Sequence, residues 1–440
     1  MDHDISLCLI FTIANCNISD AIILTGFQCS IAYQDILPII SSDNISDDDR
    51  SLFDDNIKNG NNDRSHSVIG FYQNRIARIL PLYILCNLLI LPLEYLGYLS
   101  LDPSGGTVPF IVTYITTFTF TSTMFIFLLG SPFDGVTWTV QTFVWLWIAF
   151  PLTMRYVRRI KNDDLVMYIK VLYYIQMLLV FILFFGTVSS LGFWPSFSLA
   201  TMNPVTRYPL FLMGVVAGEL VNRCNKQEVM IAKFWLHGIL IPYMCSCDGL
   251  HEVKYSHILH LSFEDKTQLA SQDLDYWRKR SNFKASLAVI LTLVVAIVNS
   301  CSPSNIMGFI WLQAIVPYCH LDIIVSLTLD KGESLTAKIL RNRVFQFLGK
   351  LGMTIYCMHY PMIYYLCFIL NKGNKVIWPP VTDYNQCTDD DCYKNVSWYN
   401  YQRSIPMWGI PVVCLTTILL SIPIYFLFEE PMRKFLQTKK

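Results

Sequence analysis

Long apolar runs alternate with short charged connectors along the chain. A run of about 20 apolar residues matches the thickness of the hydrocarbon core of a bilayer, so each such run predicts a membrane-spanning helix. The chain is therefore predicted to be an all-α polytopic membrane protein with about nine to ten transmembrane helices. The nine clearest spans cover residues 18–40, 79–99, 138–154, 171–191, 207–222, 283–300, 306–328, 344–371 and 405–428.

Basic residues orient these spans, because lysine and arginine collect on the cytosolic side of a membrane. Arg75 and Arg78 stand at the entrance of the second span and are expected to face the cytosol. The same side is expected for the basic clusters at 155–161, 278–284, 331–343 and 433–440.

Two less regular segments, 108–130 and 232–247, are assigned by counting crossings. If Arg75 and Arg155 both face the cytosol, an even number of crossings separates them, and two clear spans already do so. Segment 108–130 is therefore expected to be re-entrant, or buried without crossing, and 232–247 is expected on the cytosolic side. The same count places the N-terminus in the lumen, which leads us to expect a further helix upstream of residue 1.

The whole chain, 1–440, is expected to form a single membrane domain that is interrupted by polar segments. Residues 41–68 are rich in Asp, Asn and Ser, which predicts a disordered polar loop. Residues 223–282 are expected to form a cytosolic insert, and residues 372–404 are expected to form a lumenal loop.

The predicted lumenal loop contains two cysteines beside a glycosylation sequon. Cys387 and Cys392 lie in polar sequence just before Asn395, which begins the sequon Asn-Val-Ser. A disulfide and a glycan would both fit a lumenal location, and two free thiols with an unused sequon are the alternative.

Composition agrees with a membrane protein. Hydrophobic residues make up 53% of the chain and charged residues only 15%, against about 25% charged residues in a typical soluble domain. The formal net charge is zero, so no nucleic acid partner is expected. We expect a multi-pass protein of an endomembrane or the plasma membrane, in contact with membrane lipid.

The stretch from Phe71 to Leu85, FYQNRIARILPLYIL, is the most informative part of the sequence. Arg75 and Arg78 are three residues apart and would share one face of a helix at the cytosolic mouth. One interpretation is topological anchoring by positive charge. The other is an anion site, because guanidinium groups bind phosphate through two parallel hydrogen bonds.

A second stretch, Val344 to Leu366, places Tyr356 and His359 three residues apart on a predicted helix. An ionisable residue inside an apolar span is costly and therefore indicates a site. Histidine is the usual general base near neutral pH. The alternative is a core histidine that is hydrogen-bonded to a neighbouring helix.

Several shorter features complete the set of candidate site residues. Asp20 stands at the entrance of the first span, and Glu430 lies in the closing sequence FEEPMRKF. The helix that begins at Trp138 ends in Phe-Pro, and Gly214 and Gly218 are four residues apart, which is typical of a close helix-packing face.

Five cysteine and histidine residues lie within 16 positions of one another and are of types that can bind zinc. Their spacings match no familiar arrangement of zinc ligands, so no metal is predicted for Cys245, Cys247, His251, His257 and His260.

Taken in order, these motifs resemble the membrane-bound acyltransferase-3 family. The resemblance extends from residue 19 to residue 435 and rests on Thr25-Gly26-Phe27, Arg75 to Tyr83, Trp138 to Pro151, Pro209 to Gly214, Leu348 to Pro361 and Glu430 to Arg433. It implies an acyltransferase-3-like helix bundle. It also implies transfer of an acyl group from cytosolic acyl-CoA to a hydroxyl of a carbohydrate or lipid acceptor, with no further cofactor.

The resemblance assigns roles to individual residues. Arg75 and Arg78 are expected to bind acyl-CoA, while His359 and Tyr356 are expected to take part in catalysis. Trp138, Asp20 and Glu430 are carried over as further motif residues.

The chain departs from the family pattern at two places. The first family helix, with an Arg followed by a candidate catalytic His, is absent here, and His3 is a candidate for that histidine by its distance from Gly26 alone. The Glu that the family commonly has midway along the Trp138 helix is replaced by Phe143 and Val144.

Two alternatives therefore stay open beside the acyltransferase. One is a transporter or channel in which the same ionisable residues line a polar path. The other is an inactive relative of the family.

Overall fold

The computed structural model describes eleven stretches of the chain, and every regular element in them is a helix. The chain forms two compact units, one of residues 1–31 and 157–350 and the other of residues 32–156 and 351–440. The described residues are 21–33, 68–95, 107–124, 137–161, 164–191, 193–225, 290, 294, 316–329, 335–370 and 409–438.

Three of the described helices are long and apolar enough to cross a membrane. They are α3 (Val68–Tyr95), α7 (Leu165–Leu191) and the C-terminal helix, whose apolar stretch covers Pro411–Leu436. A span of 26 residues is about 39 Å long, which exceeds the hydrocarbon thickness of about 30 Å.

Three further helices have spanning length and a more polar composition. They are α6 (Trp138–Arg159), α9 (Pro204–Asn225) and α16 (Arg343–Leu370), with 22, 22 and 28 residues. Their buried faces carry polar side chains, as expected for helices that pack against protein and not only against lipid.

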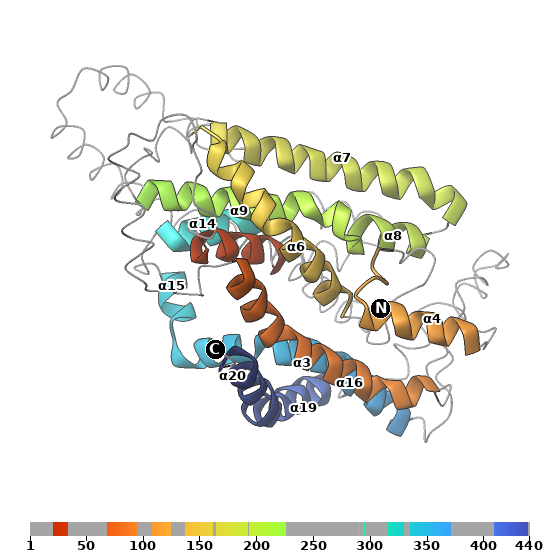
Figure 1. Cartoon of the computed structure of the whole chain (residues 1–440). Coiled ribbons are helices and arrows are strands. Elements are labelled where there is room, and N and C mark those ends of the chain that lie inside the picture. Colours follow the sequence, from red (N-terminus) through yellow and green to blue (C-terminus); the bar gives the residue numbers. More distant parts are fainter. Residues whose placement is uncertain are drawn as a thin grey trace, which may run out of the picture. The chain divides into compact units, whose positions relative to one another are not determined.

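The first unit is built around α7, which packs on α8 (Phe193–Met202) and on α9. In Figure 1, α8 and α9 follow one another along the length of α7. Asn203 separates α8 from α9 and caps the second helix, because its side-chain oxygen accepts from the Val205 N–H at 2.9 Å. Pro204 then occupies the first helical position, where no backbone donor is needed. The unit also contains α14 (Val316–Leu329) and α15 (Leu335–Leu340).

Three glycines allow the helix Ala21–Ala32 to lie directly against α9. A Cβ atom at Gly26 would overlap the Phe211 carbonyl oxygen, and one at Gly218 would lie 2.8 Å from the Phe27 carbonyl oxygen. Gly214 meets the backbone of Ile23 in the same way. The predicted packing face at Gly214 and Gly218 is thus confirmed.

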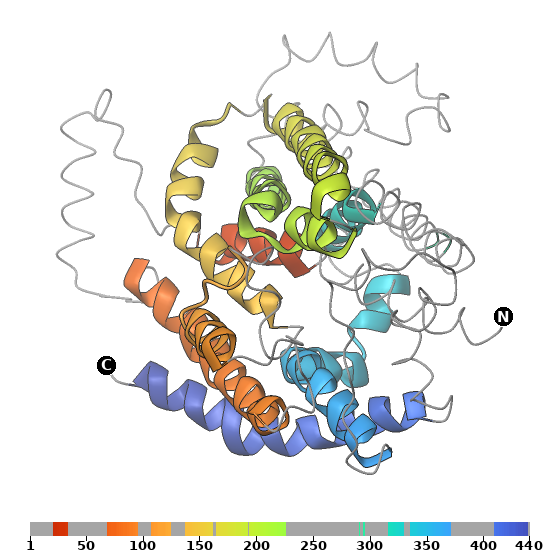
Figure 2. The same cartoon turned by 90° about the vertical axis from the view of Figure 1, so that its right-hand side faces the viewer.

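The second unit contains α3, α4 (Thr107–Phe118), most of α6 and of α16, and the C-terminal helix. The C-terminal helix consists of α19 (Gly409–Ile424), the π-helical turn η6 (Tyr425–Glu429) and α20 (Glu430–Thr438). It runs alongside α3 (Figure 2).

Side-chain contacts fix the helix directions in the second unit. The α3 and α6 helices are antiparallel, because Phe71 packs on Phe150 with ring centroids 5.0 Å apart while the Tyr83 hydroxyl meets Gln141. The α3 and α16 helices are parallel, because Cys86 contacts Met358 and the Tyr365 hydroxyl donates to the Leu89 carbonyl.

These directions agree with the orientation that the basic residues predict. Arg75 and Arg78 lie near the start of α3, and Arg155 lies near the end of the antiparallel α6. Arg433 lies near the end of the C-terminal helix, which runs along α3 in the opposite direction (Figure 2). The basic residues that the structure describes in this unit therefore gather at one end, which the positive-inside rule assigns to the cytosol.

In the described part of the doubtful segment 108–130, residues 108–124, the helix is short. At 12 residues, α4 is about 18 Å long and too short to span. It ends in a turn that has Phe120 in the left-handed conformation, with φ of 59°. The N–H groups of Phe120 and Thr121 return to the carbonyls of Thr117 and Thr116, which is the Schellman pattern of a helix end. This geometry fits the re-entrant interpretation.

Several predicted segments lie outside the described residues. These are residues 41–67 of the predicted loop 41–68, whose last residue Val68 begins α3, and the loop 372–404 with the possible disulfide and glycan. Segment 232–247 and almost all of 283–300 and of the insert 223–282 also lie outside them. Where the structure does describe a predicted span, the helix is often longer. The helix predicted at 79–99 begins at Val68. The prediction started too late because the first turns of this helix contain several polar residues.

Candidate active site

Arg75 lies in a box of aromatic rings at the basic end of the second unit. Its guanidinium carbon lies 5.6 Å, 5.7 Å and 5.8 Å from the ring centroids of Tyr33, Phe71 and Trp147. These distances are typical of cation–π contacts. Within the described part of the chain no carboxylate forms an ion pair with Arg75, and its buried Nε–H has no hydrogen-bond acceptor.

Arg78, one turn further along α3, has different surroundings. Its side chain is exposed, and its charge lies within electrostatic reach of the Glu429 carboxylate. Glu429 itself is buried, 3% exposed, and hydrogen-bonds to the Thr354 hydroxyl of α16. The two arginines are thus at the same end of α3, as predicted, while they have different neighbours.

The π-helical turn η6 places Glu429 in this buried position. The Glu430 N–H donates to the Tyr425 carbonyl five residues earlier, which inserts one residue and rotates the following side chains. Glu430, the residue that the sequence singled out, instead forms ion pairs on its own helix with Arg433 at 2.5 Å and Lys434 at 3.4 Å.

Tyr356 and His359 lie next to one another on α16, as their spacing predicts, with ring centroids 5.7 Å apart. The Tyr356 hydroxyl forms a hydrogen bond with the Thr139 hydroxyl of α6. The Nδ1 atom of His359 lies 2.5 Å from the Tyr356 carbonyl oxygen. A carbonyl only accepts, so Nδ1 carries the proton and Nε2 keeps a lone pair that can accept one.

Gln141 of α6 holds the turn after α4 against α3. Its side-chain oxygen accepts from the Ser122 hydroxyl at 2.7 Å and the Thr123 N–H at 3.1 Å. Its amide nitrogen donates to the Tyr83 hydroxyl at 2.8 Å, which in turn donates to the Thr117 carbonyl at 2.7 Å. This is a fully buried polar network between α3, α4 and α6.

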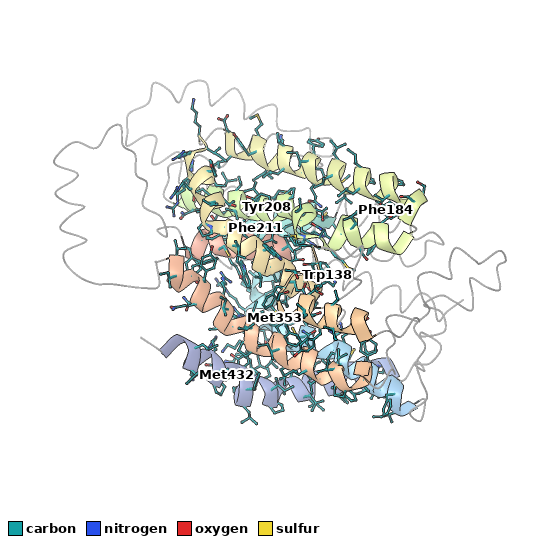
Figure 3. All side chains as sticks on the ribbon, turned by 45° about the vertical axis from the view of Figure 1, so that its right-hand side comes forward. Trp138, Phe184, Tyr208, Phe211, Met353 and Met432 are labelled. Atoms are coloured by element: carbon teal, nitrogen blue, oxygen red, sulfur yellow. The ribbon has the colours of Figure 1, made fainter. Side chains whose placement is uncertain are left out.

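The remaining candidate residues are placed as follows. Trp138 is buried at the start of α6, one residue before Thr139 (Figure 3). His3 and Asp20 lie outside the described residues, as does the cysteine and histidine cluster at 245–260.

Sequence reasoning missed Trp147, Thr139, Gln141, Thr354 and Glu429. The signal for Gln141 is present, because an amide inside an apolar run needs buried partners. Glu429 cannot be separated from Glu430 by pattern alone, since only the π-helical turn decides which of the two carboxylates faces inward.

The aromatic box around Arg75 and the Tyr356–His359 pair of α16 lie at different levels along α3. Cys86 of α3 contacts Met358, the neighbour of His359 in sequence, with the two sulfur atoms 3.6 Å apart. Cys86 follows Arg75 by eleven residues along α3. Eleven residues of helix rise about 17 Å. A basic, half-buried end and a histidine deeper in the helix bundle are therefore separated by about half the thickness of a membrane.

The chain matches the family model described as an acyltransferase domain, acyltransferase 3, over residues 61–426. The protein belongs to the acyltransferase 3 family. The match covers most of the chain and includes α3, α6 and α16, whereas Tyr33, Glu429 and Glu430 lie outside it. No curated protein and no solved structure matches the chain.

Membership of this family fixes the broad class of the protein. It is a membrane protein with an acyltransferase domain, and its enzyme class is a transferase that acts on acyl groups. The resemblance that the motifs indicated is thereby confirmed.

Proposed function

We propose that this acyltransferase moves an acyl group from cytosolic acyl-CoA to a hydroxyl of a carbohydrate or lipid acceptor. Arg75 and Arg78 bind the phosphates of the donor at the cytosolic end of α3. His359 acts as the general base deeper in the membrane, and Tyr356 holds it in place.

The separation along α3 between the level of Arg75 and the level of His359 is the observation that supports this assignment best. The arm of coenzyme A has about twelve bonds between its diphosphate and its sulfur, which is about 14 Å when extended at the rise of a peptide chain. A phosphate–guanidinium contact adds about 3 Å. The sum matches the rise of about 17 Å between the levels of Arg75 and His359.

The chemistry requires one proton to move twice. His359 Nε2 takes the proton of the acceptor hydroxyl as its oxygen attacks the thioester carbonyl carbon. The carbon–sulfur bond then breaks, and the imidazolium returns the proton to the departing sulfur. The products are the acyl ester and free coenzyme A, and neither a metal ion nor a covalent enzyme intermediate is needed for the balance.

The test is acyl transfer from acetyl-CoA, labelled in the acetyl group, by membranes that contain the protein. Labelled ester should form in the wild type, and His359→Ala should reduce its rate by about 10²- to 10⁴-fold while coenzyme A binding persists. A Tyr174→Phe control on the exposed side of α7 should retain the wild-type rate. Uptake of a labelled solute without any acyl product would favour a transporter and overturn the proposal.

A further inference from the structure

Trp147 has a buried donor without an acceptor. Its side chain is 4% exposed, and its indole N–H has no hydrogen-bond partner in the described part of the structure. A buried polar group without a partner costs roughly 1–3 kcal/mol, so it needs an explanation. The neighbouring Trp145, by contrast, donates its indole N–H to the Phe120 carbonyl at 2.8 Å.

A second buried donor lies next to it on α3. The Arg75 Nε–H also has no acceptor among the described residues, and the Arg75 guanidinium carbon is 5.8 Å from the Trp147 ring. Two donors of this kind on facing helices suit one ligand that carries several acceptor oxygens and negative charge. A phosphoryl group has this character, and a neutral or cationic ligand does not.

We infer that Trp147 is a phosphate-binding residue, whose indole N–H and the Arg75 Nε–H donate to oxygens of the same phosphoryl group. This inference rests on the proposed function, in which that group belongs to the diphosphate of acyl-CoA. The aromatic faces of Tyr33 and Phe71 then hold the Arg75 guanidinium in place without neutralising it, which leaves its charge available to the ligand.

Two substitutions separate the donor from the ring that carries it. Trp147→Phe keeps an aromatic face toward Arg75 and the stacking on Phe143, where the ring centroids are 5.8 Å apart, and it removes only the N–H. Trp147→Leu removes both. Tyr156→Phe, at an exposed position further along α6, is the control for losing a polar hydrogen.

The measurement is the affinity of coenzyme A for the full-length chain in nanodiscs of phosphatidylcholine. We expect Trp147→Phe to weaken binding about 10-fold or more, with Tyr156→Phe unchanged. If Trp147→Phe binds coenzyme A as tightly as the wild type, the inference is overturned. This holds even if Trp147→Leu binds coenzyme A weakly, because the aromatic ring, and not the N–H, would then be what supports Arg75. Failure of the wild type to bind coenzyme A would count against the proposed function instead.

A phosphoryl group can also come from a lipid headgroup. The same titration in nanodiscs that include phosphatidic acid separates the two sources. Unchanged coenzyme A affinity assigns the site to the soluble donor. Displacement of coenzyme A by the lipid in the wild type would overturn the assignment to acyl-CoA and place a headgroup at Trp147.

Discussion

Gln141, a buried side chain of α6, connects this helix with α3 and with the turn that follows α4. It forms hydrogen bonds with Ser122, Thr123 and Tyr83. In a low-dielectric interior, removing one member of such a network leaves its neighbours without partners, which is costly.

Replacement of Gln141 by Leu should therefore destabilise the protein. It leaves the Ser122 hydroxyl and the Thr123 N–H without their acceptor, at a cost of about 1–3 kcal/mol for each buried group. The temperature of unfolding in detergent should fall by several degrees. Gln73→Leu, an exposed glutamine on α3, is the matched control, and an equal effect of both substitutions would disprove a special role for Gln141.

The sequence predicts which residues of the site are close to one another on one helix, but it does not predict their contacts with other helices. The prediction of Arg75, Arg78, Tyr356 and His359 follows from spacing within one helix, which the helical geometry preserves. Thr139 and Trp147 could not be predicted in the same way, because their contacts join different helices. Whether any of these residues acts in binding or catalysis stays a prediction that the experiments above would test.

At the scale of helices, the apolar runs predict the positions of most of the long helices that the structure describes. They do not predict the irregular turns at which helices end. The 12-residue α4 is followed by a turn with Phe120 in the left-handed conformation, where glycine is usual. The Trp145 indole donates to the Phe120 carbonyl and Phe120 packs on Tyr83 with centroids 4.8 Å apart. Such tertiary contacts decide the turn, so no local pattern predicts it.

Close packing between the helix Ala21–Ala32 and α9 leads to a second prediction. Gly214→Ala would drive a Cβ atom into the Ile23 backbone, and such overpacking typically costs 1–3 kcal/mol. Gly186→Ala is the matched control, because nothing lies within 4 Å of a Cβ there. That substitution should be neutral or stabilising by roughly 0.5–1 kcal/mol.

Thermal unfolding of the two alanine variants in the same detergent checks this expectation. Gly214→Ala should unfold at a lower temperature than the wild type, and Gly186→Ala should not. Equal stability of the two variants would contradict close contact between these helices.

At the scale of the whole molecule, the basic residues and the helix directions within the second unit agree on one cytosolic end. This agreement predicts the side of each loop. Asn395 lies in the predicted lumenal loop 372–404. A second sequon, at Asn44, lies in the polar loop 41–68, which directly precedes Arg75 and Arg78 and is therefore expected on their cytosolic side.

Glycosidase treatment should consequently lower the apparent mass of the protein made in eukaryotic cells. Asn395→Gln should abolish most of that shift, and Asn44→Gln should leave it unchanged. A glycan on Asn44 would invert the topology, and it would place Arg75 on the side opposite to cytosolic acyl-CoA.

The central claim is that Arg75 binds the phosphates of the acyl donor, and the affinity of coenzyme A for wild-type and Arg75→Lys protein tests it most directly. Lysine keeps the charge but cannot reproduce the planar, two-point contact of a guanidinium. Losing one charged hydrogen-bonded contact should cost roughly 1.5–3 kcal/mol, so binding should weaken about 10- to 150-fold.

Two controls accompany this measurement. Lys439→Gln should bind coenzyme A like the wild type, and pantetheine, which lacks the phosphates, should bind wild type and Arg75→Lys equally weakly. Coenzyme A affinity that is unchanged in Arg75→Lys, with expression preserved, would contradict the account, because topological anchoring needs only the positive charge that lysine retains.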